Sequence, residues 1–87
     1  MASKQRKDLG RYIVVDPKIC HGKPTFRGTR IMVRQVLKQV AKAMSWDTIS
    51  AEWRGAVSKE AIAEAVELAE RIFEEHALEY AQESLPT

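Results

Sequence analysis

The sequence has little of what defines several common classes of small protein. One cysteine, Cys20, excludes an internal disulfide, and a short chain without disulfides is typical of a reducing compartment, so we expect a cytoplasmic protein. No apolar run approaches the roughly 20 residues needed to cross a bilayer, and the basic N-terminus lacks the apolar stretch of a signal peptide. We therefore expect no association with a membrane.

The chain also has no internal repeat, no low-complexity segment and no linker, so its 87 residues predict a single domain. The hydrophobic fraction of 45% and charged fraction of 30% exclude full disorder. A chain of this size buries only about 60–65% of the surface that it exposes when unfolded, which makes a lone monomer marginal. A homodimer is therefore expected.

Acids are scarce in the first half of the sequence and bases are scarce in the second half. Residues 1–42 contain eleven Lys and Arg and only two acids, a net charge of +9, whereas residues 43–87 carry a net charge of −7. Such asymmetry suggests a polyanion as the partner of the first half. The alternative is that the two halves neutralise each other, within one chain or across a dimer.

The N-terminal half predicts a short β-ribbon. Residues 1–9 are polar and basic without periodicity, which predicts a flexible arm. Residues 12–15 are aromatic and β-branched and stop at Asp16-Pro17, as a short strand does. Residues 25–26 and 29–33 predict a hairpin around Gly28, with the alternation of a half-exposed strand in its second arm. The ribbon therefore spans residues 12–33.

Three helices are predicted after the ribbon, over about residues 33–44, 46–53 and 58–82. Val33, Val36, Leu37, Val40 and Met44 recur at helical spacing. Ser45 and Ser58 are good N-caps for the second and third helices. The third helix is long, with one apolar stripe and many glutamates on the remaining surface. The expected fold is mainly α: a short N-terminal β-ribbon, then three helices, the last one long, all in one domain over residues 10–83.

The strongest candidate site is a cluster of cations on the ribbon and the first helix. Such density on a ribbon-to-helix unit is what contacts with nucleic-acid phosphates require. The alternatives are a solvated face, or contact with an acidic patch on a sister subunit. The candidate DNA-binding residues are Lys23, Arg27, Arg30, Arg34, Lys38 and Lys42.

No pattern predicts an enzyme, a metal site or a cofactor. Cys20 and His21 are too few for zinc, which needs about four ligands, and the other histidine, His76, belongs to the distant third helix. Gly22-Lys23 lacks the earlier glycine and following hydroxyl residue of a phosphate-binding loop. The glutamates of the third helix are predicted to lie on a solvated face, which disfavours a pair of catalytic carboxylates.

Four apolar or aromatic residues are candidate protein contacts. Trp46 and Trp53 are seven residues apart, which places them on one face of the second helix. This spacing favours the core or a dimer interface, and we predict the interface; the alternative is a platform on which bases stack. Leu78 and Tyr80, near the end of the third helix, are candidate anchors for a partner protein. The alternative is that the stripe of this helix serves only the core and the dimer interface.

The segment from Asp16 to Val33 resembles the DUF433 family of domains of unknown function. The pattern consists of Asp16-Pro17, Ile19, Gly22-Lys23-Pro24, Gly28-Thr29-Arg30, Ile31 and Val33, followed by Ser45 and Ile49. The resemblance covers about residues 12–70. Two turn positions depart from the family pattern, which commonly has glycine where this chain has Ala43-Met44, and Tyr-Pro where it has Trp53-Arg54.

The resemblance implies a homeodomain-like helix-turn-helix fold and a function as an antitoxin. Such a protein would neutralise a PIN-like ribonuclease toxin and bind operator DNA to repress its own operon. In a helix-turn-helix protein the recognition helix enters the major groove, but here that helix is strongly acidic, so the basic ribbon, arm and first helix are the expected DNA contacts. A dimer that places paired strands in the groove is a structural alternative. The alternative function is a protein-interaction module with no role in nucleic-acid binding.

Overall fold

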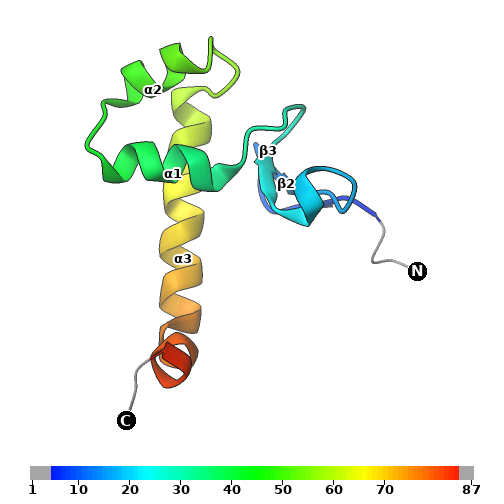
Figure 1. Cartoon of the computed structure of the whole chain (residues 1–87), viewed down its shortest axis with the longest axis vertical. Coiled ribbons are helices and arrows are strands. Elements are labelled where there is room, and N and C mark those ends of the chain that lie inside the picture. The colour runs from blue at the N-terminus through cyan, green and yellow to red at the C-terminus, as the bar shows by residue number, and fades with distance from the viewer. Residues whose placement is uncertain (1–4, 85–87) are drawn as a thin grey trace.

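A three-stranded antiparallel sheet stands beside a group of three helices (Figure 1). The computed structural model describes residues 5–84, with side chains to residue 82. The elements are β1 (Lys7–Asp8), β2 (Ile13–Val15), β3 (Pro24–Phe26), α1 (Val33–Ala41), α2 (Trp46–Glu52) and α3 (Lys59–Ser84). The expected fold class, mainly helical with a small N-terminal β-structure and a long last helix, is confirmed.

The sheet contains one strand more than the sequence predicts. Its order is β1-β2-β3, and the central strand pairs Ile13 with Phe26 on one side and Val15 with Lys7 on the other. The prediction of an arm without regular structure is therefore wrong at Lys7 and Asp8. The backbone N–H of Leu9 donates to the carbonyl of Ile13 over 2.8 Å, which closes the turn between β1 and β2.

The hairpin after β2 is shorter than predicted. Gly28 adopts a φ of +78°, and the N–H of Thr29 donates to the carbonyl of Phe26, as the tight turn requires. The expected second arm over residues 29–33 is not a strand, since it forms a single bridge, between Met32 and Thr25. Val33 instead opens α1, and the side chain of Gln35 accepts from the N–H of Met32 to close that helix end.

Serine caps and left-handed turns set the helix ends. Ser45 Oγ accepts from the N–H of Thr48, and Ser58 Oγ accepts from the N–H of Ala61, so both predicted N-caps are confirmed. α1 ends at Ala41, before the predicted residue 44, because Ala43 takes a φ of +64°. The N–H of Met44 then donates to the carbonyl of residue 39, which is the hydrogen bond of a Schellman motif.

Residues from both parts of the fold form one core. The largest wholly buried apolar side chains come from β2, β3 and all three helices. Because burial of apolar surface drives folding, this core joins the sheet to the helices. Its central residues are Ile13, Phe26, Val36, Ile49 and Ile62.

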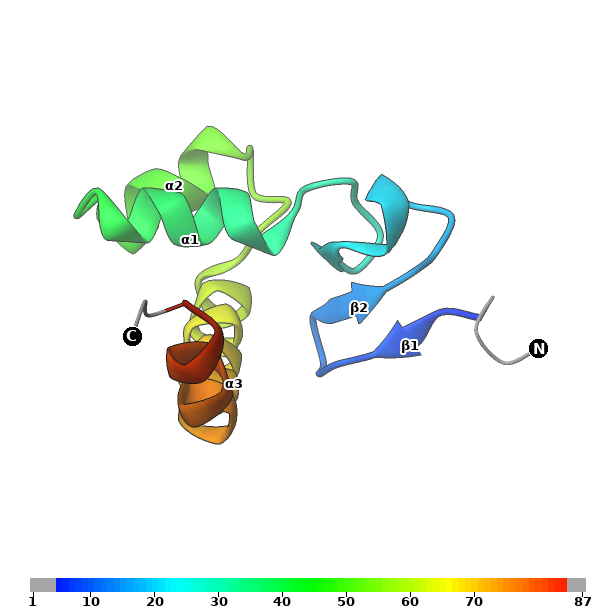
Figure 2. The same ribbon diagram turned by 60° about the horizontal axis from the view of Figure 1, so that its bottom comes forward.

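α3 extends well beyond this core (Figures 1 and 2). The helix buries Ala61, Ile62 and Ala65, whereas Ile72 is 50% exposed and Phe73 is 69% exposed. The Cα radius of gyration is 14.3 Å, against about 12 Å expected for a compact domain of this length. The second half of α3 therefore lacks a partner within the described part of the chain. None of the described helices is long and apolar enough to cross a membrane.

Candidate nucleic-acid interface

The outer face of α1 carries a row of cations. Arg34, Lys38 and Lys42 are spaced by four residues and therefore share one side of the helix, while Val36 on the other side is buried in the core. The three cations line a shallow surface depression together with Gln35 and other side chains. Because the opposite face of α1 packs in the core, the three cations are held close together on the solvent-exposed side of the helix.

Five of the six predicted DNA-binding cations have no anionic partner within residues 5–82, whose side chains the structure describes. Each of the five is exposed, and none forms an ion pair there. Other cations behave differently: Lys59 lies 2.9 Å from Asp47, and this contact raises the pKa of the lysine. The unpaired set, which we call the basic face, consists of Lys23, Arg30, Arg34, Lys38 and Lys42.

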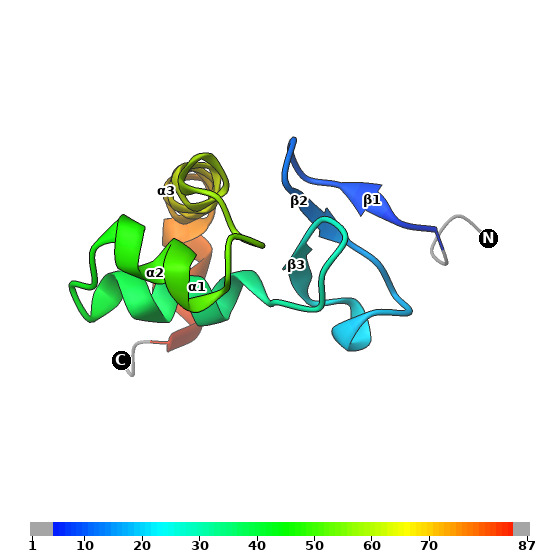
Figure 3. The ribbon, with the colours of Figure 1, turned by 90° about the horizontal axis from the view of Figure 1, so that it is seen from above.

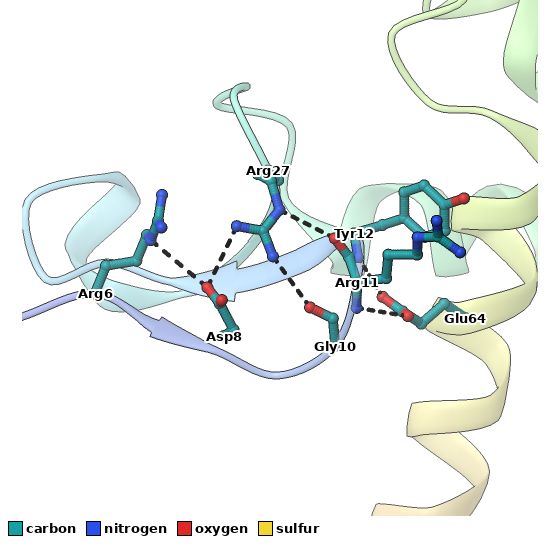
Figure 4. Close-up of polar contacts among 7 residues, drawn as sticks. All are labelled: Arg6, Asp8, Gly10, Arg11, Tyr12, Arg27 and Glu64. Atoms are coloured by element: carbon teal, nitrogen blue, oxygen red, sulfur yellow. Dashed lines mark hydrogen bonds and ion pairs between the residues drawn. The ribbon is translucent and has the colours of Figure 1, made fainter.

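Arg27, the sixth predicted cation, is engaged within the chain (Figure 4). Its Nε donates to the carbonyl of Arg11 over 3.0 Å and its Nη2 donates to the carbonyl of Gly10 over 3.2 Å. Its Nη1 lies 3.4 Å from Asp8 Oδ1. The guanidinium thus joins the turn after β3 to the turn between β1 and β2, and its donors are engaged at that turn although the side chain lies at the surface.

Glu64 holds the sheet against α3, a role that the sequence did not reveal. Its carboxylate accepts from the N–H of Arg11 over 2.8 Å and from the N–H of Tyr12 over 2.7 Å (Figure 4). The prediction that the glutamates of this helix are all solvated is wrong here, since Glu64 is half-buried. The carboxylate also occupies the space where a side chain at Gly10 would lie, because a Cβ there would be 2.6 Å from Glu64 Cδ.

The two tryptophans have different environments. Trp53 packs against the core, and its Nε1 donates to Gln39 Oε1 over 2.8 Å. Gln39 Nε2 in turn donates to Glu52 Oε1, which links α1 to the end of α2. Trp46 is 37% exposed. Core packing therefore accounts for Trp53, while Trp46 is the more accessible member of the predicted interface pair.

The Cys20-His21 segment forms a tight turn with left-handed backbone. Both residues have positive φ values, 52° and 57°, and Cys20 Sγ donates to the carbonyl of Arg30 over 3.4 Å. His76 lies on α3, where Glu79 at 2.9 Å raises its pKa. Among the described residues, no three side chains of His, Cys, Asp or Glu gather as metal ligands would.

An apolar groove of about 490 Å³ lies between the sheet, α1 and α3. Its walls include Ile13 of β2, Leu37 of α1, and Leu68, Ile72 and Phe73 of α3. Figure 3 shows α3 nearly end-on, with the sheet on one side and α1 crossing it. Lys23 and Arg34 also line the groove, so the basic face borders it.

The predicted anchors Leu78 and Tyr80 are both exposed, by 75% and 68%, but they do not share a surface. Two residues of separation turns the direction of a helical side chain by about 200°. Tyr80 continues the apolar stripe that contains Ile72, whereas Leu78 lies on the opposite, acidic side with Glu67 and Glu74. Leu78 and Tyr80 therefore offer two separate contacts.

Comparison with known proteins matches the chain to a family model. The model of the family described as "Protein of unknown function (DUF433)" matches residues 13–69, which include the sheet from β2 onward, α1, α2 and the packed part of α3. No curated protein and no solved structure matches the chain.

Proposed function

The chain belongs to the DUF433 family, and on that premise we propose that it is an antitoxin-like, DNA-binding autoregulator that neutralises a PIN-like ribonuclease toxin. The observation that carries the proposal is the basic face, whose cations are exposed and have no anionic partner among the described side chains. Such a surface releases condensed counterions when it meets a phosphate backbone, which is the main source of affinity for DNA.

The basic face favours α1 over α3 as the element that contacts DNA. Successive cations of α1 are about 6 Å apart along the helix axis, so the row can meet several phosphates. The start of α3 is less suitable, because Lys59 is paired with Asp47 and is followed by Glu60. The α3 glutamates further along would be repelled by phosphates.

The DNA-binding part of the proposal is tested by neutralising three cations of α1 together. Binding to the DNA upstream of its own gene is measured over a range of salt concentrations for the wild type and for R34Q/K38Q/K42Q. We expect weaker binding by the variant, and a slope of log K against log salt that is smaller in magnitude by about 2.7, since each lost phosphate contact contributes about 0.9.

The matched control is Arg71→Gln, which removes an exposed cation from the far side of α3 and should leave both affinity and slope unchanged. A triple variant with the wild-type slope would contradict the role of the basic face. A wild-type protein that binds no DNA at low salt would favour the alternative function, a protein-interaction module.

The acidic side of the second half of α3 is the surface that we assign to the toxin. Four acids and one cation line this side, Glu67, Glu70, Glu74 and Glu75 with Arg71, and the exposed Leu78 follows them along the helix. A ribonuclease needs a cationic groove for RNA, so a projecting acidic helix is complementary to it. In such contacts charge speeds association, while a buried apolar anchor supplies much of the affinity.

Charge reversal on this side tests the assignment. Glu70→Lys and Glu74→Lys, made together, are expected to slow association with the PIN-like ribonuclease that the proposal names as the toxin, and to abolish its inhibition at equimolar amounts. Glu60→Lys changes the same charge near the start of α3 and serves as the control. Inhibition that survives the double reversal, or that is lost equally in the control, would move the toxin contact elsewhere.

A further inference from the structure

The apolar groove and the projecting half of α3 fit each other. We propose that the groove of one chain receives the second half of α3 from a second copy of the same chain, in a two-fold arrangement with the two α3 helices antiparallel. This inference does not depend on DNA binding or on a toxin.

Exposure of apolar side chains is the first support. Ile72 and Phe73 are 50% and 69% exposed although they form one end of the groove wall, and Leu9 at the sheet side is 40% exposed. By helical spacing the same stripe of α3 continues to His76 and Tyr80. A contiguous apolar surface of this kind on a small domain marks a contact with another macromolecule.

Self-complementarity is the second support. One surface contains both a groove, formed with Leu37 and Leu68, and a ridge, formed by the stripe beyond Phe73. A two-fold axis near Ile72 places the ridge of each copy over the groove of the other. This is the condition for a closed contact that uses the same patch twice.

Charge complementarity selects a second copy as the occupant. Lys23 and Arg34 are the charged residues of the groove wall, and both are cations. Residues 66–82 contain five acids and one base, and helical spacing places two of these acids, Glu75 and Glu79, beside the apolar stripe that would enter the groove. An antiparallel order brings Glu75 and Glu79 past the cations of the other copy, whereas a parallel order would align them with each other.

The experiment compares two variants that each introduce a charge, on opposite sides of α3. The monomer–dimer equilibrium of each is measured by sedimentation velocity from low to high micromolar protein concentration, without DNA. The wild type is expected to be a dimer, and Phe73→Glu is expected to raise the dissociation constant at least a hundredfold. Leu78→Glu inserts the same charge at a residue that is 75% exposed on the other side of the helix, and it should remain a dimer.

Both residues are exposed in the single chain, so neither change should unfold it, and circular dichroism with thermal melting verifies this for each variant. A wild type that is monomeric throughout would overturn the proposal and leave the groove to a different protein. A Phe73→Glu variant that dimerises like the wild type would also overturn it, as would equal loss in Leu78→Glu. Because the experiment contains no DNA, its outcomes do not depend on whether the protein binds DNA.

Discussion

Ile62→Ala is expected to lower the free energy of unfolding by about 2–5 kcal/mol, the range for truncating a buried isoleucine. Ile62 is wholly buried where α3 crosses the core. A small domain has a total stability of roughly 0.05–0.15 kcal/mol per residue, so this single loss is a large share of the whole. Urea unfolding monitored by helical circular dichroism measures the change.

Ile72→Ala is the matched control, because it makes the same truncation ten residues later on the same stripe. Ile72 is 50% exposed, so we expect a loss below about 1 kcal/mol when the protein is dilute enough to be a single chain. Equal losses at the two positions under those conditions would mean that the second half of α3 folds back on the core, contrary to its projection in the structure.

The second large effect is expected at the contact between Glu64 and the turn beside Gly10. Glu64→Ala removes two hydrogen bonds from backbone N–H groups to a carboxylate, and we expect a loss of about 2–3 kcal/mol, because bonds to charged groups contribute more than neutral ones. Gly10→Ala is expected to cost less than this, because its new Cβ would push against the end of the flexible Glu64 side chain and weaken its two hydrogen bonds without removing them.

The two changes form a double-mutant cycle. Once Glu64 is alanine, the space beside Gly10 is vacant, so Gly10→Ala should add little further loss. Chemical denaturation of the four proteins gives the coupling. Additive losses would show that the two residues act independently, and would remove Glu64 as the group that positions the sheet.

The position of the sheet affects both the basic face and the apolar groove. Leu9, Ile13 and Lys23 all line the groove from the sheet side. Because Glu64 and Arg27 hold the turns of this sheet in place, changes at either residue act on binding through the position of others. Arg27→Ala would therefore be a poor probe of direct DNA contact, although the residue lies within the predicted cationic cluster.

The sequence predicted the parts of the fold that depend on periodicity and local capping. The period of 3.6 residues located the first and third helices, and the hydroxyl residues Ser45 and Ser58 located the starts of the second and third. It did not predict β1, because a two-residue polar strand has neither alternation nor β-branched residues. Its pairing is set by the backbone of β2 instead.

For the candidate site, charge patterning identified the five cations of the basic face but could not separate Arg27 from them. The difference lies in carbonyl groups of the chain around Gly10, which leave no signature in the residue types. The sequence did not reveal the role of Glu64 for the same reason, since the partners of its carboxylate are backbone N–H groups more than fifty residues away along the chain. Its place at the edge of the apolar stripe was the one available signal.

The two left-handed residues around α2 affect how the native protein opens. Ala43 and Arg54 occupy the positions that glycine usually takes after a helix, with φ values of 64° and 55°, and each costs about 1–2 kcal/mol. Between them α2 has seven residues and buries only Ile49. Opening this segment relieves both strained turns at the loss of the buried Ile49 and of the core contact and hydrogen bond of Trp53, so its amides should exchange with solvent through a local opening of lower free energy than global unfolding. The fold is thus divided into an early-opening α2 and a more protected unit of α1, the sheet and the packed part of α3.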